Sequence, residues 1–176
     1  MVSAAAKLSL HPEVADVWSW LSDVPDPEIP VVSVVDLGIV RDVHWETKGG
    51  AESELVVTIT PTYSGCPATS VIAFEIERAI RDHGVDRVRL KTQISPPWTT
   101  DWISQAGRER LKEYGIAPPA KARHLADRLS GKAAAAECPR CGSANTVRVS
   151  EFGSTPCKAL YKCSDCFEPF DLFKCL

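Results

Sequence analysis

Four cysteines near the C-terminal end of the chain have the spacing of ligands for a single metal ion. They form two C-x-x-C pairs, Cys138 with Cys141 and Cys163 with Cys166, with 21 residues between the pairs. Each pair can direct two thiolates at one ion, and two pairs complete the tetrahedron that zinc adopts in structural sites. A segment of about 40 residues cannot form a sufficient core by itself, so metal binding should fold it. Residues 137–176 therefore predict a zinc ribbon with a structural Zn²⁺.

Two more cysteines in the tail, Cys157 and Cys175, exceed what one zinc ion takes. Each can be a buried structural cysteine, or both can add thiol ligands to an iron–sulfur site, since such clusters are also held by thiolates. The spacing alone leaves open whether the tail metal is zinc or an iron–sulfur cluster.

The seventh cysteine, Cys66, stands apart in "TITPTYSGCPATS", where a strand-like run changes into a helix-like run. At a helix N-terminus the unpaired N–H groups and the helix dipole favour a thiolate, which makes the sulfur a better nucleophile and soft-metal ligand. Thr60 and Gly65 belong to a loop that can hold the sulfur near the surface, and Pro67 suits a first helical turn. The alternative is a small, half-buried cysteine in a turn.

Enzymatic chemistry finds little support in the sequence. A catalytic thiol needs a neighbouring base, and the histidines are scattered at expected surface or helix-end positions: His11, His44, His83 and His124. The Glu-x-x-His pairs of a carboxylate-bridged di-iron site and the glycine-rich dinucleotide fingerprint are both missing from the sequence. We therefore expect no catalytic activity of the chain's own.

The composition indicates a globular protein. Of the 176 residues, 44% are hydrophobic and 24% charged, and the sequence contains no signal peptide or membrane span, so we expect a cytoplasmic protein without a membrane partner. Residues 1–66 carry a net charge of -7 and residues 107–132 one of +4, whereas the tail has 5 charges of each sign. A neutral tail lacks the basic stripe that phosphate contacts require, which argues against nucleic-acid binding.

The expected secondary structure places Cys66 in a small α+β domain, residues 1–120. Residues 39–47 and 53–60 resemble the two strands of a hairpin joined by the turn "KGGAE", and residues 85–94 alternate as a third strand. Helices are expected at 12–21, at 67–83 and, from a capping Asp101, at 101–114. These elements predict a three-stranded sheet with helices packed on one face. A linker, residues 121–136, leads to the cysteine-rich ribbon of residues 137–176.

Several motifs in this order resemble a known family. The stretches "DPEIPVVSVVDLGIV", "LVVTITPTYSGCPAT" and "VRLKTQISPPWTTDWIS" resemble the small α+β domains involved in iron–sulfur protein assembly, which include the bacterial factor SufT. Together with the tail "STPCKALYKCSDCFEPFDLFKC", they resemble the PaaD (PaaJ) family, the accessory subunits encoded with the phenylacetyl-CoA epoxidase of aerobic phenylacetate degradation. The resemblance covers nearly the whole chain.

The resemblance implies roles for particular residues. The cysteine of the "GCP" stretch is the critical residue of the family, and here it is Cys66. The "DPE" and "DLG" stretches supply Asp26, Glu28, Asp36 and Gly38, which would lie near that cysteine as loop-shaping or partner-contacting groups. Asp36 is equally explained as an ordinary turn residue.

The resemblance also implies a role and partners. The epoxidase is a multi-subunit di-iron monooxygenase whose reductase subunit carries an iron–sulfur cluster. An accessory factor of this kind would mature or repair those metal centres, with iron or a cluster held transiently at Cys66. Its partners would be the oxygenase and reductase subunits and the iron–sulfur assembly machinery. The alternative is a structural scaffold held stoichiometrically in the oxygenase complex.

Overall fold

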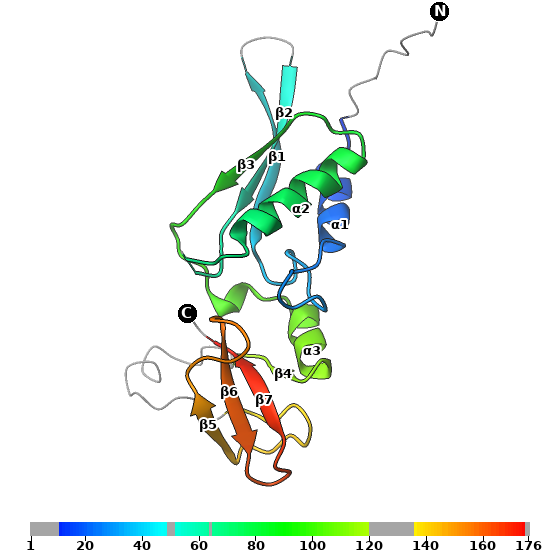
Figure 1. Ribbon diagram of the computed structural model, residues 1–176. Coiled ribbons are helices and arrows are strands. Elements are labelled where there is room, and N and C mark those ends of the chain that lie inside the picture. The colour runs from blue at the N-terminus through cyan, green and yellow to red at the C-terminus, as the bar shows by residue number, and fades with distance from the viewer. Residues whose placement is uncertain (1–10, 49–51, 64, 120–135, 175–176) are drawn as a thin grey trace, which may run out of the picture.

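A computed structural model describes residues 11–48, 52–63, 65–119 and 136–174 (Figure 1). Its elements, in chain order, are α1 Val14–Ser22, β1 Val40–Lys48, β2 Glu52–Ile59, α2 Thr69–Asp82, β3 Val88–Thr92, the 3₁₀ helix η1 Thr100–Trp102, α3 Gln105–Glu113, β4 Ile116–Ala117, β5 Thr146–Ser150, β6 Lys158–Cys163 and β7 Pro169–Phe173. No helix in these ranges is long and apolar enough to cross a membrane. The expected linker at 121–136 lies outside them except for its last residue.

The first sheet has the order β1-β2-β3, with β2 in the centre. Strands β1 and β2 form the expected antiparallel hairpin, in which Trp45 lies opposite Leu55. Strand β3 runs parallel to β2, with Leu90 opposite Val57. A parallel neighbour requires a crossover connection, and α2 provides it. The result is the α+β architecture that the sequence indicates.

Helices α1 and α2 lie on the same side of this sheet (Figure 1). The buried stripe of α2 is formed by residues four apart, Ile72, Ile76 and Ile80, which is the spacing of one helix face. This stripe shares a core with Leu55 and Val57 of β2. Burying side chains of this size contributes roughly 1.5–3 kcal/mol each, and Cys66 packs against the core that they form.

The helix expected at 101–114 is shorter than the sequence indicates. A 3₁₀ turn ends at Trp102, Ile103 is extended with φ -65° and ψ 125°, and α3 begins only at Gln105. The cap is Ser104 instead of Asp101, because the Ser104 hydroxyl accepts a hydrogen bond from the Gly107 N–H at 2.8 Å. The expected cap at Asp101 is therefore wrong, and the helix starts later along the chain.

The second sheet has the order β4-β7-β6-β5 and contains the cysteine-rich tail. Its edge strand β4 comes from the end of the first domain and pairs in parallel with β7, Ile116 opposite Asp171. At the end of β7, Phe173 is buried in the core of the first domain, with its ring centroid 6.0 Å from that of Trp98. The two modules thus share a strand pairing and part of one core.

Gly38 has a backbone conformation that other residues adopt only with strain, with φ +65°. A Cβ at this position would lie 2.6 Å from the Trp102 carbonyl oxygen and 2.7 Å from the Trp102 Cβ. We expect Gly38→Ala to lower the free energy of unfolding by about 2–4 kcal/mol, from the strained φ together with the clash. Chemical denaturation measures this. Gly115→Ala is the control, because φ there is +92° with no atom within 4 Å; an equal loss in both variants would show that the clash contributes nothing.

Candidate metal centre and cysteine pocket

The four paired tail cysteines come together as the sequence predicts. Their sulfur atoms all lie within 4.8 Å of one another. The Cys138 and Cys166 sulfurs are 3.7 Å apart, and those of Cys141 and Cys163 are 3.6 Å apart. Zn–S bonds of about 2.3 Å in a tetrahedron separate the sulfurs by about 3.8 Å. The donor set and its dimensions therefore fit a single zinc ion, which would fix the two turns to each other.

Both cysteine turns end in the same backbone conformation. The residue directly after the second cysteine of each pair has a positive φ, +75° at Gly142 and +64° at Phe167. Phe167 accepts this conformation although a side chain disfavours it, which indicates that the turn geometry is imposed by the cysteine cluster. Sequence reasoning missed these positions; Gly142 directly after Cys141 was the available signal.

Backbone amides prepare one of the thiols for metal binding. The N–H groups of Cys166 and then Asp165 bond to the Cys163 sulfur and lower the pKa of this thiol to about 7. An ionised sulfur is the form that binds a metal ion. The Asp165 carboxylate is in turn held by the Asn145 amide, at 2.8 Å. The second turn is thereby tied to the segment that follows the first.

The structure places Cys66 before α2 instead of at its cap. The helix begins at Thr69, two residues later than the expected start at Pro67, and its N-cap residue is Ala68. The Cys66 carbonyl accepts hydrogen bonds from both the N–H and the hydroxyl of Thr69, at 3.2 and 2.9 Å. This separate turn delays the helix, so the expected helix start at Pro67 is wrong. The side chain is half-buried against the core.

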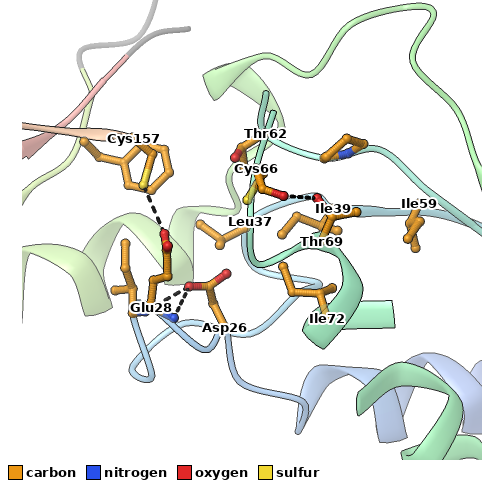
Figure 2. Close-up of a pocket in the computed structure, with 13 residues that line it drawn as sticks. Asp26, Glu28, Leu37, Ile39, Ile59, Thr62, Cys66, Thr69, Ile72 and Cys157 are labelled. Carbon is orange, nitrogen blue, oxygen red and sulfur yellow. Dashed lines mark hydrogen bonds between the residues drawn. The ribbon is translucent and has the colours of Figure 1, made fainter. Parts of the chain in front are cut away.

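Cys66 lies on the wall of a small recess that opens to solvent. Two carboxyl groups, Asp26 and Glu28, line this pocket together with Cys66 (Figure 2). The residues around its wall contain no histidine, and their side chains are mostly aliphatic, as at Leu37 and Ile72. The pocket is therefore an acidic, thiol-containing recess with a largely apolar wall.

Asp26 is buried at the base of this pocket, 7% exposed. Its Oδ1 accepts hydrogen bonds from the Ile29 N–H at 2.8 Å and the Glu28 N–H at 3.0 Å. Burial raises the pKa of Asp26, although these two N–H groups oppose the shift. The carboxyl group thus shapes the "DPE" turn and presents Glu28, which is only partly buried, toward the pocket.

The other residues expected around Cys66 divide into two groups. Asp36 lies outside the pocket wall and joins its own loop to α3, accepting from the Ser104 hydroxyl at 2.9 Å and pairing with Arg110. Gly38 permits the close approach of Trp102 and does not line the pocket. Thr60 is buried in the Cys66 loop. Gly65 and Pro67 flank Cys66 in the chain, and both are exposed.

Of the two additional tail cysteines, the structure describes only Cys157. Cys157 is buried at 5% exposure and does not belong to the four-cysteine cluster. It lies instead on the wall of the pocket that contains Cys66 (Figure 2). Cys175 lies outside the described residues. No sequence pattern indicates the placement of Cys157, because it depends on how the two modules pack.

The fold and the cysteines define a two-module protein, an iron–sulfur-assembly-type domain followed by a zinc ribbon. Two family models match accordingly: "Iron-sulfur cluster assembly protein" at residues 14–89 and "PaaD zinc beta ribbon domain" at residues 122–174. The chain is 48% identical over 168 residues to an Escherichia coli protein named as a subunit of the "Putative 1,2-phenylacetyl-CoA epoxidase", covering 94% of each. It belongs to this PaaD family of epoxidase subunits.

Other relatives match the first module. A "Fe-S protein maturation auxiliary factor" of Porphyromonas gingivalis is 34% identical over 102 residues, which are 57% of this chain and 90% of that protein. A crystal structure of a domain of unknown function, DUF59, from Bacillus anthracis is 26% identical, with a TM-score of 0.49, over 55% of this chain and 89% of that one.

Proposed function

We propose that this chain matures the metal centres of the phenylacetyl-CoA epoxidase, with Cys66 as the thiol that transiently holds iron or a cluster. The observation that carries the proposal is the half-buried Cys66 sulfur facing a recess with two carboxyl groups, Asp26 and Glu28. Thiolate and carboxylate donors together suit iron and similar transition metals. Membership of the epoxidase subunit family supports the choice of client.

The ribbon has a different part in this proposal. Its four cysteines hold a structural zinc ion, and its outer surface docks on the oxygenase or reductase subunit. Val147 and Val149 of β5 are exposed there at 53% and 59%, and Phe152 at 62%. Exposed apolar side chains close together on an edge strand are typical of an interaction surface. Docking would bring the Cys66 recess to the recipient protein.

Replacing Cys66 by Ser tests the proposal directly. Serine keeps the size and polarity of the side chain but removes the thiolate, so we expect the cluster content of the co-expressed reductase subunit to fall to the level found without this chain. Iron and acid-labile sulfide in the purified reductase measure the effect, and the iron content of the oxygenase is measured in parallel. Normal occupancy of both centres with Cys66→Ser would reject the proposal.

The naming of the Escherichia coli relative as an epoxidase subunit favours a second candidate, a scaffold that stays in the oxygenase complex. Purification of the assembled epoxidase separates the two. A scaffold remains in the mature complex at an equal ratio and tolerates Cys66→Ser, whereas a maturation factor is absent from the mature complex and does not tolerate the substitution.

A further inference from the structure

The Cys66 pocket is built by both modules. Its wall includes Cys66 from the turn before α2, and also Cys157 and Phe173 from the ribbon. Cys157 lies in the turn before β6, and Figure 2 shows its sulfur directed toward the loop that carries Glu28 and Asp26. Two thiols and two carboxyl groups therefore face one recess, although 90 residues lie between the two cysteines in the chain.

The surroundings of Cys157 are not those of a cysteine packed as a small apolar group. Its Sγ lies 3.7 Å from the Glu28 carboxylate oxygen, toward which it donates, and 3.0 Å from the Thr155 hydroxyl. Burial raises the pKa of Cys157, and the negative charges of Glu28 and Asp26 act in the same direction. A buried thiol next to two acids is stabilised when a cation joins them, because a bound metal ion replaces the protons.

A charged side chain of the ribbon does not neutralise this cluster completely. Lys158 is 5% exposed, and its ammonium group lies 3.8 Å from a carboxylate oxygen of Asp171. Its charge favours the ionised forms of Asp26 and Cys157, but it is already shared with Asp171. One lysine thus interacts with two carboxyl groups, Asp26 and Asp171, and with one thiol, and Glu28 adds a further acid to the recess.

A hydroxyl group beside Cys66 also lacks a well-formed partner. The Tyr63 side chain packs against the core, and its hydroxyl oxygen is buried without a hydrogen bond to any residue that the structure describes. Burial raises the pKa of Tyr63, and the charges of Cys66, Glu28 and Cys157, together with a contact to the Cys66 thiol, act in the same direction. Tyr63 does not line the recess itself, so its hydroxyl belongs to the polar surroundings of Cys66 and not to the set of proposed ligands.

We propose that Cys66 and Cys157, with the carboxylate of Glu28, form a binding site for one divalent transition-metal ion at the junction of the two modules. This inference rests on the proposed function, and it identifies ferrous iron as the cargo. Binding replaces the two thiol protons, which go to solvent, by two metal–sulfur bonds, and no electrons are transferred. Thiolate and carboxylate donors in one recess suit Fe²⁺ and also Co²⁺, which serves as its spectroscopic probe.

The site is not assembled to ligand distance without the ion. Among the residues that the structure describes, the four ribbon cysteines are the one group of three or more possible metal ligands whose donor atoms lie within 4.8 Å of one another. Cys66, Cys157 and Glu28 do not form such a group. The ion would therefore draw Cys66 and Cys157 together and tighten the junction. Part of the binding free energy is used for this closure, so the metal affinity of the junction site is lower than that of the ribbon site. A lower affinity allows the site to release its cargo.

The experiment titrates the full-length, zinc-loaded protein with Co²⁺ under anaerobic conditions. We expect one further equivalent to bind, with thiolate-to-cobalt charge-transfer absorption. Cys157→Ser should about halve this absorption and weaken binding at least tenfold, since even outer-shell partners of a metal contribute 10–100-fold. Ser154→Ala is the control. Ser154 lies in the same loop as Cys157, and this substitution removes a hydrogen bond from Ser154 to Asp171 of β7. It should leave the cobalt titration unchanged.

The two proposals fail in different ways. If Cys157→Ser leaves the cobalt absorption and affinity unchanged while Cys66→Ser abolishes them, the junction site is wrong and Cys66 acts without Cys157. If the wild-type protein binds no cobalt beyond its zinc, the junction site is also wrong. The cluster content of the reductase with Cys66→Ser then decides the proposed function independently. A native-like circular dichroism spectrum and one retained zinc in Cys157→Ser exclude misfolding as the cause of a loss.

Discussion

Replacing Cys138 by Ser is expected to lower the zinc content from one ion per chain to nearly none and to unfold the ribbon. Cys138 is fully buried, and its sulfur lies 3.7 Å from that of Cys166. Structural zinc contributes roughly 10–16 kcal/mol to the folding of small zinc domains, and a segment of about 40 residues has too small a core to fold without it. Elemental analysis of the purified protein measures the zinc, and limited proteolysis measures the folding of residues 136–174.

Cys157→Ser is a matched control for the zinc prediction, because it also removes a buried ribbon thiol but one outside the four-cysteine cluster. It should retain one zinc per chain and a protease-resistant ribbon. Loss of zinc in both variants would show that any cysteine substitution unfolds this module. A Cys138→Ser protein that keeps its zinc and its resistance would contradict the assignment of the metal centre.

The zinc ribbon was predictable from the sequence because its chemistry is local. Each C-x-x-C pair fixes two ligands within one turn, so the spacing alone indicates which sulfurs meet. Helix α2 was predictable for a similar reason, since the four-residue stripe of Ile72, Ile76 and Ile80 reflects one buried face. The three strands were predictable from their short apolar runs bounded by turn residues. The errors occurred at element ends, where a side chain decides: Ser104 caps α3, and the Thr69 hydroxyl closes the turn before α2.

The composition of the Cys66 pocket was only partly predictable. Asp26 and Glu28 were placed near Cys66 through the family resemblance, and the structure brings these three residues together. Cys157 could not be placed, because 90 residues lie between it and Cys66 and no periodic pattern records how two modules pack. The same holds for β4, which pairs with β7 across a long stretch of chain. Local patterns specify elements, whereas the junction arises from tertiary packing.

Phe173→Ala should destabilise the first domain although Phe173 belongs to the ribbon. The side chain is 1% exposed and lies in the same core as Trp98 and Leu37. Removing a buried phenylalanine costs about 3–5 kcal/mol, through lost burial and the cavity left behind. For a chain of 176 residues, this corresponds to a melting temperature lower by roughly 10 °C. Differential scanning calorimetry measures it, and the intrinsic fluorescence of the tryptophans reports on the first domain.

Phe152→Ala is the control for this substitution, because Phe152 is a ribbon phenylalanine that is 62% exposed. It should change the free energy of unfolding by less than about 1 kcal/mol. Zinc content should stay at one per chain in both variants, since neither residue belongs to the four-cysteine cluster. If Phe173→Ala leaves the tryptophan transition unchanged, the two modules fold independently, and the shared core at their junction does not couple them. A lowered transition with zinc retained would instead establish that the end of β7 stabilises the domain that holds Cys66.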